Sequence, residues 1–336
     1  MAAPLLQIEE LQVIYSGDGA DRVALDGVSL GVHQGEAVGV VGESGCGKTT
    51  LALSIMRLLA PAARIGAGRV LFEGVDLLGL PERAMRRLRG KRVAMVFQEP
   101  ASALNPVLSV GEQIAEVARL HDGLNRSLAR ARAVEALRAA GIASSERWVD
   151  AYPHQMSGGM RQRATIAMAL VGNPALLLAD EPTTALDPTV EAQVLALLGR
   201  LRKERGLAVL LISHDFLTVS ELCDRVVVLY AGQIVEQGPA RAVFERPGHP
   251  YTRALLECLP GARARDAKWR RARLRVIPGA SPEVGSASEG CRFSARCTRC
   301  DTRCRTSAPQ LEEVGEAHWV RCFVPWEKAE ADQERR

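Results

Sequence analysis

A glycine-rich segment near the start of the 336-residue chain has the residue types and spacing needed to hold a polyphosphate. Two glycines with four residues between them, followed by lysine and threonine, form the P-loop pattern. Lys48 would neutralise the β- and γ-phosphates, and the Thr49 hydroxyl would bind Mg²⁺. The residues expected to contact a nucleotide here are Gly42, Glu43, Ser44, Gly45, Cys46, Gly47, Lys48, Thr49 and Thr50. For Cys46, a redox-sensing role is the alternative to that of a small spacer.

Two adjacent carboxylates at the end of an apolar run could complete a hydrolytic site. Residues 176–181 read Leu-Leu-Leu-Ala-Asp-Glu, so a buried strand would deliver Asp180 and Glu181 at its end. Adjacent residues of a strand point to opposite sides, so the two acids can take different roles. Asp180 would hold Mg²⁺ and Glu181 would polarise the attacking water. Alone, a strand that ends in Asp-Glu is weak evidence for a hydrolytic site. It becomes strong evidence because a P-loop is present in the same chain.

The elements that must position these residues follow from the hydrophobic pattern. Residues 5–15 and 23–32 alternate like paired strands around a turn at 16–22. Helical patterns separate most of the short apolar runs, which predict buried strands at 36–41, 92–97, 175–180, 208–213 and 225–230. This alternation predicts an α/β layered core with a largely parallel sheet. Residues 98–168 are mostly helical in pattern and predict a helical insertion.

Composition sets the class of protein. Hydrophobic residues make up 47% and charged residues 24% of the chain, which is typical of a protein that folds in water. No apolar run approaches the roughly 20 residues that cross a bilayer, and the first 15 residues lack a signal-peptide layout, so we expect a cytosolic protein. The net charge of +4 gives little support to nucleic-acid binding. The basic run 263–275 is interpreted as a solvated helix or linker, with a lipid- or nucleic-acid-binding patch as the alternative.

At this point the first 255 residues or so resemble the ABC ATPase family. Residues 156–163, Met-Ser-Gly-Gly-Met-Arg-Gln-Arg, are similar to the family signature, and Gln98 after an apolar run matches the Q-loop. Ala185-Leu186-Asp187 matches the D-loop, and His214 matches the switch histidine. Tyr15 lies where the family stacks an aromatic ring on adenine. All these elements occur in the order of the family.

The resemblance implies a fold and a set of roles. The fold is a P-loop NTPase core with an antiparallel β-subdomain and a helical subdomain at about 99–168, in a nucleotide-binding domain at 1–258. The implied catalytic residues are Glu181, His214, Gln98 and Lys48, and the implied Mg²⁺ ligands are Thr49, Gln98 and Asp180. In an ABC dimer the signature residues Ser157, Gly158 and Gly159 cap the ATP of the partner subunit, and Asp187 of the D-loop is expected among the nucleotide-binding residues. A regulatory cassette that binds ATP without cutting it would lack Glu181 or His214.

Several stretches are similar to the ATPase subunits of bacterial dipeptide and oligopeptide importers, specifically to the first, D-type subunit. They are residues 97–106, 157–170 and 173–198. This resemblance implies a heterodimer with a sister ATPase, two membrane permeases and an extracytoplasmic binding protein. It also implies a peripheral position on the cytoplasmic face of the inner membrane and no nucleic-acid partner. Glutathione, nickel chelates or opines are alternative cargoes, and a soluble ABC ATPase outside transport is the alternative class.

The composition changes after about residue 259, where cysteines gather in a predicted extension at 259–336. Segments 275–282, 290–297 and 318–323 are similar to the C-terminal extension of the same importers. The resemblance implies a structural 4Fe-4S cluster held by Cys291, Cys297, Cys304 and Cys322, with Cys300 as an extra cysteine. A Zn²⁺ site is the competitor, because Cys297 and Cys300 have the spacing of a zinc knuckle. Unligated thiols are the third possibility.

Overall fold

The computed structural model describes residues 3–17, 21–99, 103–184, 186–259, 276–280 and 289–326. Several features of the sequence lie wholly or partly outside these ranges, among them residues 18–20 of the turn predicted at 16–22, the segment 100–102 after Gln98, Ala185, the basic run 263–275 and the ends of the segment 275–282. Within the described ranges, no helix combines the length and the apolar character needed to cross a membrane.

The strands form two sheets. The four-stranded sheet has the order β2-β1-β4-β5 and consists of β1 (Leu6–Ser16), β2 (Asp21–Val32), β4 (Ala63–Phe72) and β5 (Val75–Asp76). The eight-stranded sheet has the order β11-β12-β10-β9-β3-β8-β7-β6. Its strands are β3 (Ala37–Val41), β6 (Val93–Val96), β7 (Leu176–Asp180), β8 (Ala208–Ser213), β9 (Arg225–Tyr230), β10 (Gln233–Pro239), β11 (Glu312–Gly315) and β12 (His318–Val320).

The middle of the large sheet is parallel, as the apolar runs predict. Strands β6, β7, β8, β3 and β9 pair in parallel, and every residue of β3, β6, β7 and β8 is buried. Such continuous burial is typical of a parallel sheet that is covered on both faces. The small sheet confirms the predicted pairing of β1 with β2, but the two strands reach Ser16 and Asp21 and so extend into the predicted turn.

The described helices begin and end at recognisable caps. Ser109 accepts a hydrogen bond from the Glu112 N–H at 3.2 Å where α4 begins, and Gly123 ends that helix with a positive φ. The helices are α1 (Lys48–Met56), α2 (Glu82–Leu88), α4 (Val110–Asp122), α5 (Arg126–Ala139), α6 (Ser145–Trp148), α7 (Gly158–Leu170), α8 (Pro188–Arg205), α9 (Phe216–Leu222), α10 (Ala240–Glu245), α11 (Pro250–Glu257) and α12 (Arg303–Thr306). Two short 3₁₀ turns, η1 (Pro153–Gln155) and η3 (Ser294–Arg296), complete the set.

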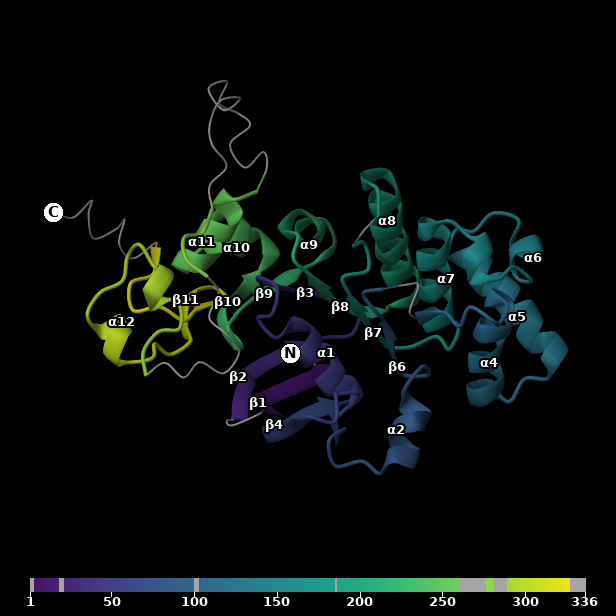
Figure 1. Ribbon diagram of the computed structural model, residues 1–336, viewed down its shortest axis with the longest axis horizontal. Coiled ribbons are helices and arrows are strands. Elements are labelled where there is room, and N and C mark those ends of the chain that lie inside the picture. Colours follow the sequence, from purple (N-terminus) through teal and green to yellow (C-terminus); the bar gives the residue numbers. More distant parts are fainter. Residues whose placement is uncertain are drawn as a thin grey trace, which may run out of the picture.

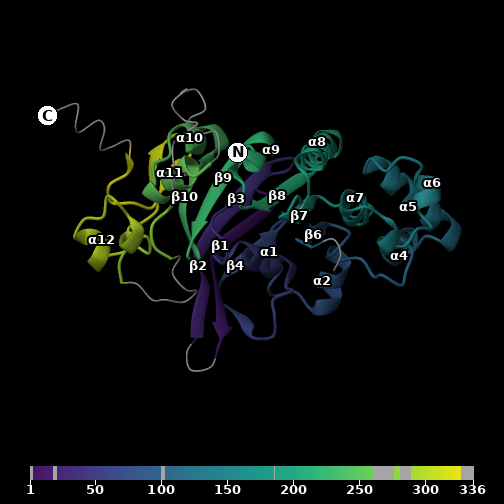
Figure 2. The same cartoon turned by 45° about the horizontal axis from the view of Figure 1, so that its top comes forward.

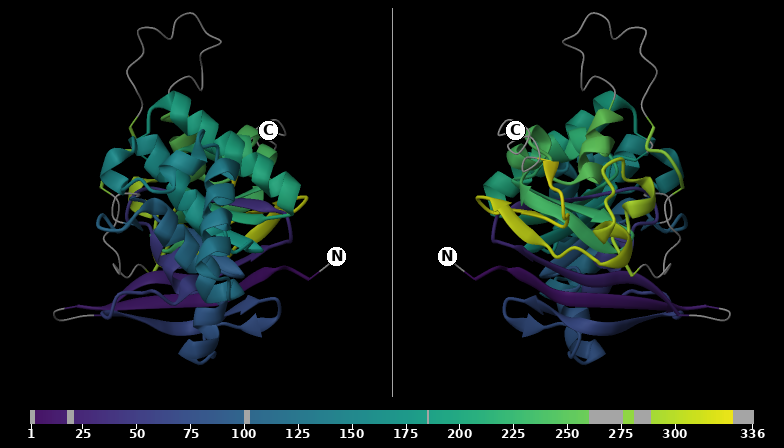
Figure 3. Two further views of the ribbon diagram at one scale, coloured as in Figure 1. Left: turned by 90° about the vertical axis from the view of Figure 1, so that its right-hand side faces the viewer. Right: turned by 90° about the vertical axis from the view of Figure 1, so that its left-hand side faces the viewer.

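Two apolar layers lie on the two faces of the large sheet. Val38 and Val40 face the layer shared with α1 and the small sheet, whereas Ala37 and Val41 face the layer shared with α7, α8 and α9. Figure 3 shows this stacking, with the small sheet on one side and helices on the other. Helices α4 to α7 form an arm at one end of the molecule (Figure 1), and they lie between β6 and β7 in the sequence.

The cysteine-bearing part of the chain lies at the opposite end from this arm (Figures 1 and 2). Its strand β12 pairs antiparallel with β10, placing Val320 opposite Glu236 and Trp319 opposite Gln237. Strand β11 then pairs with β12 at the edge of the sheet. The extension therefore continues the sheet of the core.

Candidate nucleotide and metal sites

The P-loop connects the end of β3 to the start of α1 at Lys48. Gly42 and Gly47 have φ values of 156° and 109°, which favour glycine. A Cβ atom at Gly42 would lie 2.2 Å from the Leu229 carbonyl oxygen, and one at Gly47 would lie 2.9 Å from the Ala24 carbonyl oxygen. These two glycines are therefore needed for the curl of the loop.

Lys48 is only 6% exposed, although its side chain carries a charge. Its Nζ donates to the carbonyl oxygens of Gly42 at 2.8 Å and Glu43 at 2.9 Å. These bonds compensate part of the cost of burying the ammonium group and hold it under the loop. The charge is thus already placed where a polyphosphate would lie on the loop amides.

A pocket of about 430 Å³ opens beside the P-loop. The predicted residues that line it come from four separate parts of the sequence and are Tyr15, Ser44, Gly45, Gly47, Lys48, Thr49, Thr50, Gln98 and Glu181. Two further lining residues, Arg22 and Ala24, were missed by the sequence reasoning. Arg22 lies opposite Tyr15 in the β1–β2 pairing, so the register of these two strands was the feature that could have identified it as a pocket residue.

Asp180 lies at the end of β7 with 2% of its surface exposed, and its Oδ1 is a buried atom without a hydrogen-bond partner. Burial raises the pKa of this carboxyl group, and a hydrogen bond with the Thr49 side chain opposes that shift. A buried carboxylate oxygen without a partner next to a threonine hydroxyl fits a divalent cation. Thr49 and Asp180 would hold Mg²⁺, which would neutralise phosphate charge.

Glu181 follows β7 with a φ of 47°, a left-handed conformation that is uncommon for a non-glycine residue. Its Oε2 accepts hydrogen bonds from Gln98 Nε2 at 3.0 Å and from the Thr184 hydroxyl at 2.9 Å. His214 Nδ1 lies 3.2 Å from the same oxygen. The structure therefore brings Gln98, Glu181 and His214 together, and it adds Thr184, which no sequence motif singled out. A carboxylate fixed in this way can polarise a water molecule at the edge of the pocket.

The signature residues and Asp187 do not line this pocket. The Ser157 side chain caps α7 by accepting from the Met160 N–H at 3.3 Å. Asp187 caps α8 by accepting from the N–H groups of Thr189 at 3.1 Å and Val190 at 3.0 Å. Both residues therefore have local roles at helix starts, and the amides of residues 158 and 159 belong to the first turn of α7.

Two predicted loop residues turn away from the pocket as well. The Glu43 carboxylate binds Arg296, and Cys46 is 6% exposed with a thiol whose pKa is raised by burial.

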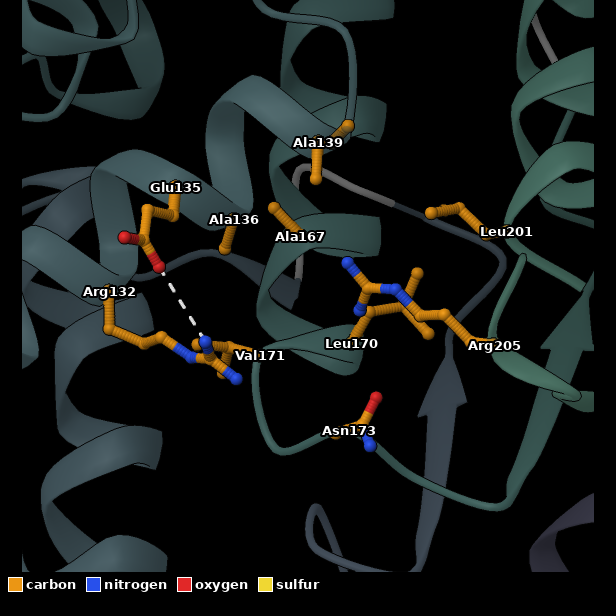
Figure 4. Close-up of a pocket in the computed structure, with 11 residues that line it drawn as sticks. Arg132, Glu135, Ala136, Ala139, Ala167, Leu170, Val171, Asn173, Leu201 and Arg205 are labelled. Carbon is orange, nitrogen blue, oxygen red and sulfur yellow. Dashed lines mark ion pairs between the residues drawn. The ribbon is translucent and has the colours of Figure 1, made fainter.

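A separate pocket of about 270 Å³ lies between α5, α7 and α8 (Figure 4). Arg132 from α5 and Arg205 from α8 line it, but it contains none of the predicted site residues. The P-loop pocket thus brings together only part of the predicted nucleotide residues.

The predicted cluster ligands lie near one another in the extension, and burial raises the pKa of each thiol, to about 11 for Cys304 and about 12 for Cys322. The sulfur atoms of Cys297 and Cys322 accept backbone N–H groups at 3.4 Å, from Arg299 and from Val324 respectively. The Cys300 thiol instead donates to the Asp301 carbonyl oxygen at 3.4 Å.

This donor set fits thiolates that bind iron, because N–H groups directed at sulfur stabilise the charged form. In the described part of the chain, however, no three His, Cys, Asp or Glu side chains are arranged to hold a metal ion.

Comparison with known proteins gives two family matches. The model described as "ABC transporter" matches residues 25–184, and the model described as "Oligopeptide/dipeptide transporter, C-terminal region" matches residues 235–304. A probable peptide ABC transporter ATP-binding protein of Sinorhizobium fredii is 48% identical over 95% of this chain and 94% of its own length. The dipeptide transport ATP-binding protein DppD of Escherichia coli is 43% identical over 97% of this chain and 98% of its own length.

Solved structures agree with these relatives. An ATP-binding cassette, solved as a dimer in a post-hydrolysis state with ADP and Pi, is 28% identical, covers 70% of this chain and 99% of its own, and has a TM-score of 0.64. CbiO1 from Clostridium perfringens, part of an ABC transporter complex, is 31% identical, covers 73% of this chain and 92% of its own, and has a TM-score of 0.62. The P-loop pocket thus lies in a cassette fold, and the chain belongs to the ABC ATPase family, among the ATP-binding proteins of ABC transporters.

Proposed function

We propose that the chain is the ATP-hydrolysing subunit of an importer for dipeptides or oligopeptides. The observation that carries the proposal is the convergence of Lys48, Thr49, Gln98 and Glu181 on one pocket. The cargo is supported by relatives that are named for peptide and dipeptide transport, and by the C-terminal region that matches the oligopeptide/dipeptide transporter model. The chain would act with two membrane permeases and an extracytoplasmic binding protein, peripherally at the cytoplasmic face of the inner membrane.

Each predicted residue takes a role in this proposal. Tyr15 stacks on the adenine ring, and the loop amides with Lys48 hold the phosphates. Thr49 and Asp180 hold Mg²⁺, and Gln98 adds a contact to the metal. Glu181 polarises the attacking water, and His214 holds the Glu181 carboxylate in place.

The second half of each ATP site would come from a sister ATPase in a heterodimer. Ser157, Gly158 and Gly159 lie outside the pocket at the start of α7, where the N–H groups of Gly158 and Gly159 would face a phosphate of the partner. The related cassette solved with ADP and Pi is a dimer, which supports this arrangement. The proposal also divides the chain into a nucleotide-binding domain at 1–258, with a helical subdomain at about 99–168 that contacts the permeases, and an extension at 259–336.

We expect peptides to stimulate ATP hydrolysis when the chain is assembled with its permeases and binding protein. Cargo-loaded binding protein favours the closed dimer, so phosphate release should rise severalfold over the rate without cargo. The measurement is phosphate release with a dipeptide, an oligopeptide, glutathione, a nickel chelate or an opine. Stimulation by one of the last three alone would assign that cargo instead, and no stimulation by any of the five would contradict a transport role.

We further infer that Cys291, Cys297, Cys304 and Cys322 hold a structural 4Fe-4S cluster, with Zn²⁺ as the alternative. The inference is supported by the backbone N–H groups that the sulfur atoms of Cys297 and Cys322 accept. Binding of the metal would release the protons of the four thiols, of which Cys304 is buried and the other three are partly buried, and would stabilise an extension with a small core of its own.

Alanine substitutions should separate the four ligands from Cys300. We expect anaerobically purified protein to be brown, and substitution of any one of the four to remove most of the iron and the visible absorption. Cys300→Ala should retain both, because the Cys300 thiol bonds to a carbonyl oxygen. The measurement is iron, sulfide and zinc content together with the visible spectrum. Colourless protein with stoichiometric zinc would replace the cluster, and loss of iron in Cys300→Ala with retention in Cys304→Ala would contradict the ligand set.

A further inference from the structure

Glu43, the second residue of the P-loop, is held at all three of its hydrogen-bonding groups. Its N–H donates to the Tyr251 hydroxyl at 2.9 Å, and its carbonyl oxygen accepts from Lys48 Nζ at 2.9 Å. Its carboxylate accepts two bonds from Arg296, at 2.7 and 2.9 Å. One residue therefore links the phosphate-binding lysine to a residue 253 positions later in the chain.

The contact between Arg296 and Glu43 is bidentate and largely shielded from water. The Arg296 side chain is 7% exposed and that of Glu43 is 22% exposed. Arg296 Nε also donates to the Pro278 carbonyl oxygen at 3.0 Å, which fixes the plane of the guanidinium group. Hydrogen bonding to Glu43 raises the pKa of Arg296 further above its ordinary range. Paired, shielded charges of this geometry resist separation much more than exposed pairs do.

The turn that carries Arg296 is itself anchored on the core. Phe293 is 3% exposed and packs against Tyr230 and Tyr251, with ring centroids 5.2 and 5.4 Å apart. Arg292 donates to the Ala231 carbonyl oxygen and to Asp26. The same Tyr251 that packs on Phe293 holds the Glu43 N–H. The segment between Cys291 and Cys297 thus docks behind the P-loop as one unit.

We propose that Arg296 is a positioning residue for the nucleotide loop, through which the cysteine segment sets the affinity of the P-loop for ATP. The inference rests on the proposed function, because it assigns the loop to ATP. Arg296 does not line the pocket and contacts Glu43 instead. The bonds from Arg296 hold the Glu43 carboxylate and thereby keep the Glu43 carbonyl oxygen in place. That oxygen accepts a hydrogen bond from the Lys48 ammonium group, which is therefore held in place as well. Loss of the pair would leave the loop free to adopt conformations that do not bind phosphate.

The test is the dissociation constant for ATP, measured on the full-length chain together with the thermal unfolding midpoint. Arg296→Ala should raise the dissociation constant about tenfold, since the loop must be ordered at the moment of binding. Glu43→Gln should have a similar effect without altering the extension. Arg296→Lys should lie between wild type and Arg296→Ala, because lysine restores the charge but not the two parallel bonds. The double variant Glu43→Gln with Arg296→Ala should be no weaker than either single variant.

Arg299→Ala is the matched control. Arg299 lies three residues away in the same segment, but its guanidinium stacks over the Trp326 ring, 4.5 Å from the centroid. This variant should bind ATP within about twofold of wild type, since the Glu43 contact is intact. If Arg296→Ala and Glu43→Gln lower only the unfolding midpoint and leave ATP affinity within twofold, the pair is structural and the proposal is wrong. If Arg296→Ala does not fold, Glu43→Gln alone decides. Failure of the wild-type chain to bind ATP would instead contradict the proposed function.

Discussion

Replacing Glu181 by glutamine is expected to lower phosphate release from ATP by at least about 100-fold, because an amide cannot polarise the attacking water as a carboxylate does. The change keeps the size of the side chain. One of its terminal atoms can still contact Thr184 and His214, which now surround Glu181 Oε2. The P-loop is untouched, so ATP should remain bound. Phosphate release and ATP binding, measured on the same assembled transporter, check both halves of the expectation.

ATP should then accumulate in a closed dimer of the Glu181→Gln variant, since closure precedes hydrolysis and opening follows it. A matched control is Glu191→Gln, a glutamate of α8 whose carboxylate accepts from the Thr218 hydroxyl at 3.0 Å outside the pocket. This control should keep most of the phosphate release. Steady hydrolysis by Glu181→Gln at near the wild-type rate would show that another group activates the water.

Replacing Lys48 by alanine should instead weaken ATP binding itself. The dissociation constant for ATP should rise by about 10- to 100-fold, because charge-assisted hydrogen bonds to the phosphates are lost. The ammonium group is the positive charge that the pocket presents under the loop, and it also holds the carbonyl oxygens of Gly42 and Glu43. Its loss removes the phosphate contact and two bonds that shape the loop. Equilibrium binding of ATP to the full-length chain measures the effect.

Lys91→Ala is the control for the loss of a lysine. Lys91 forms an ion pair with Asp122, the last residue of α4, and does not line the pocket. Because exposed ion pairs contribute little, this variant should bind ATP as the wild type does. ATP affinity in Lys48→Ala within twofold of the wild type would make the P-loop assignment wrong.

The parts of the site that the sequence could predict are those in which local pattern determines position. The P-loop and the Asp180-Glu181 pair each lie within a few residues of a buried strand, so the order strand, loop and helix places them at one edge of the sheet. The fully buried strands were predictable for the same reason, because continuous apolar runs have few other solutions.

Other contacts depend on register or on distant docking. Arg22 reaches the pocket because it pairs with Tyr15 across the β1–β2 hairpin. The sequence pattern assigned Arg22 to the turn at 16–22, but strand β2 begins at Asp21 and so includes it. Thr184 contacts Glu181 through the left-handed backbone of Glu181, which no motif specifies. The pair of Glu43 and Arg296 joins residues far apart in the chain and requires the extension to dock against β9 and α11. Local propensity carries no information on such contacts.

Accumulation of a labelled dipeptide in vesicles tests the central claim most directly. The vesicles would contain this chain with the permeases and the sister ATPase proposed for it, facing an interior loaded with ATP and Mg²⁺, and peptide with the proposed binding protein would be supplied outside. The account predicts that labelled peptide accumulates inside vesicles with ATP, and that vesicles without ATP or with Glu181→Gln show none. Equal entry of peptide with and without ATP, or no entry in either case while ATP is hydrolysed, would contradict it.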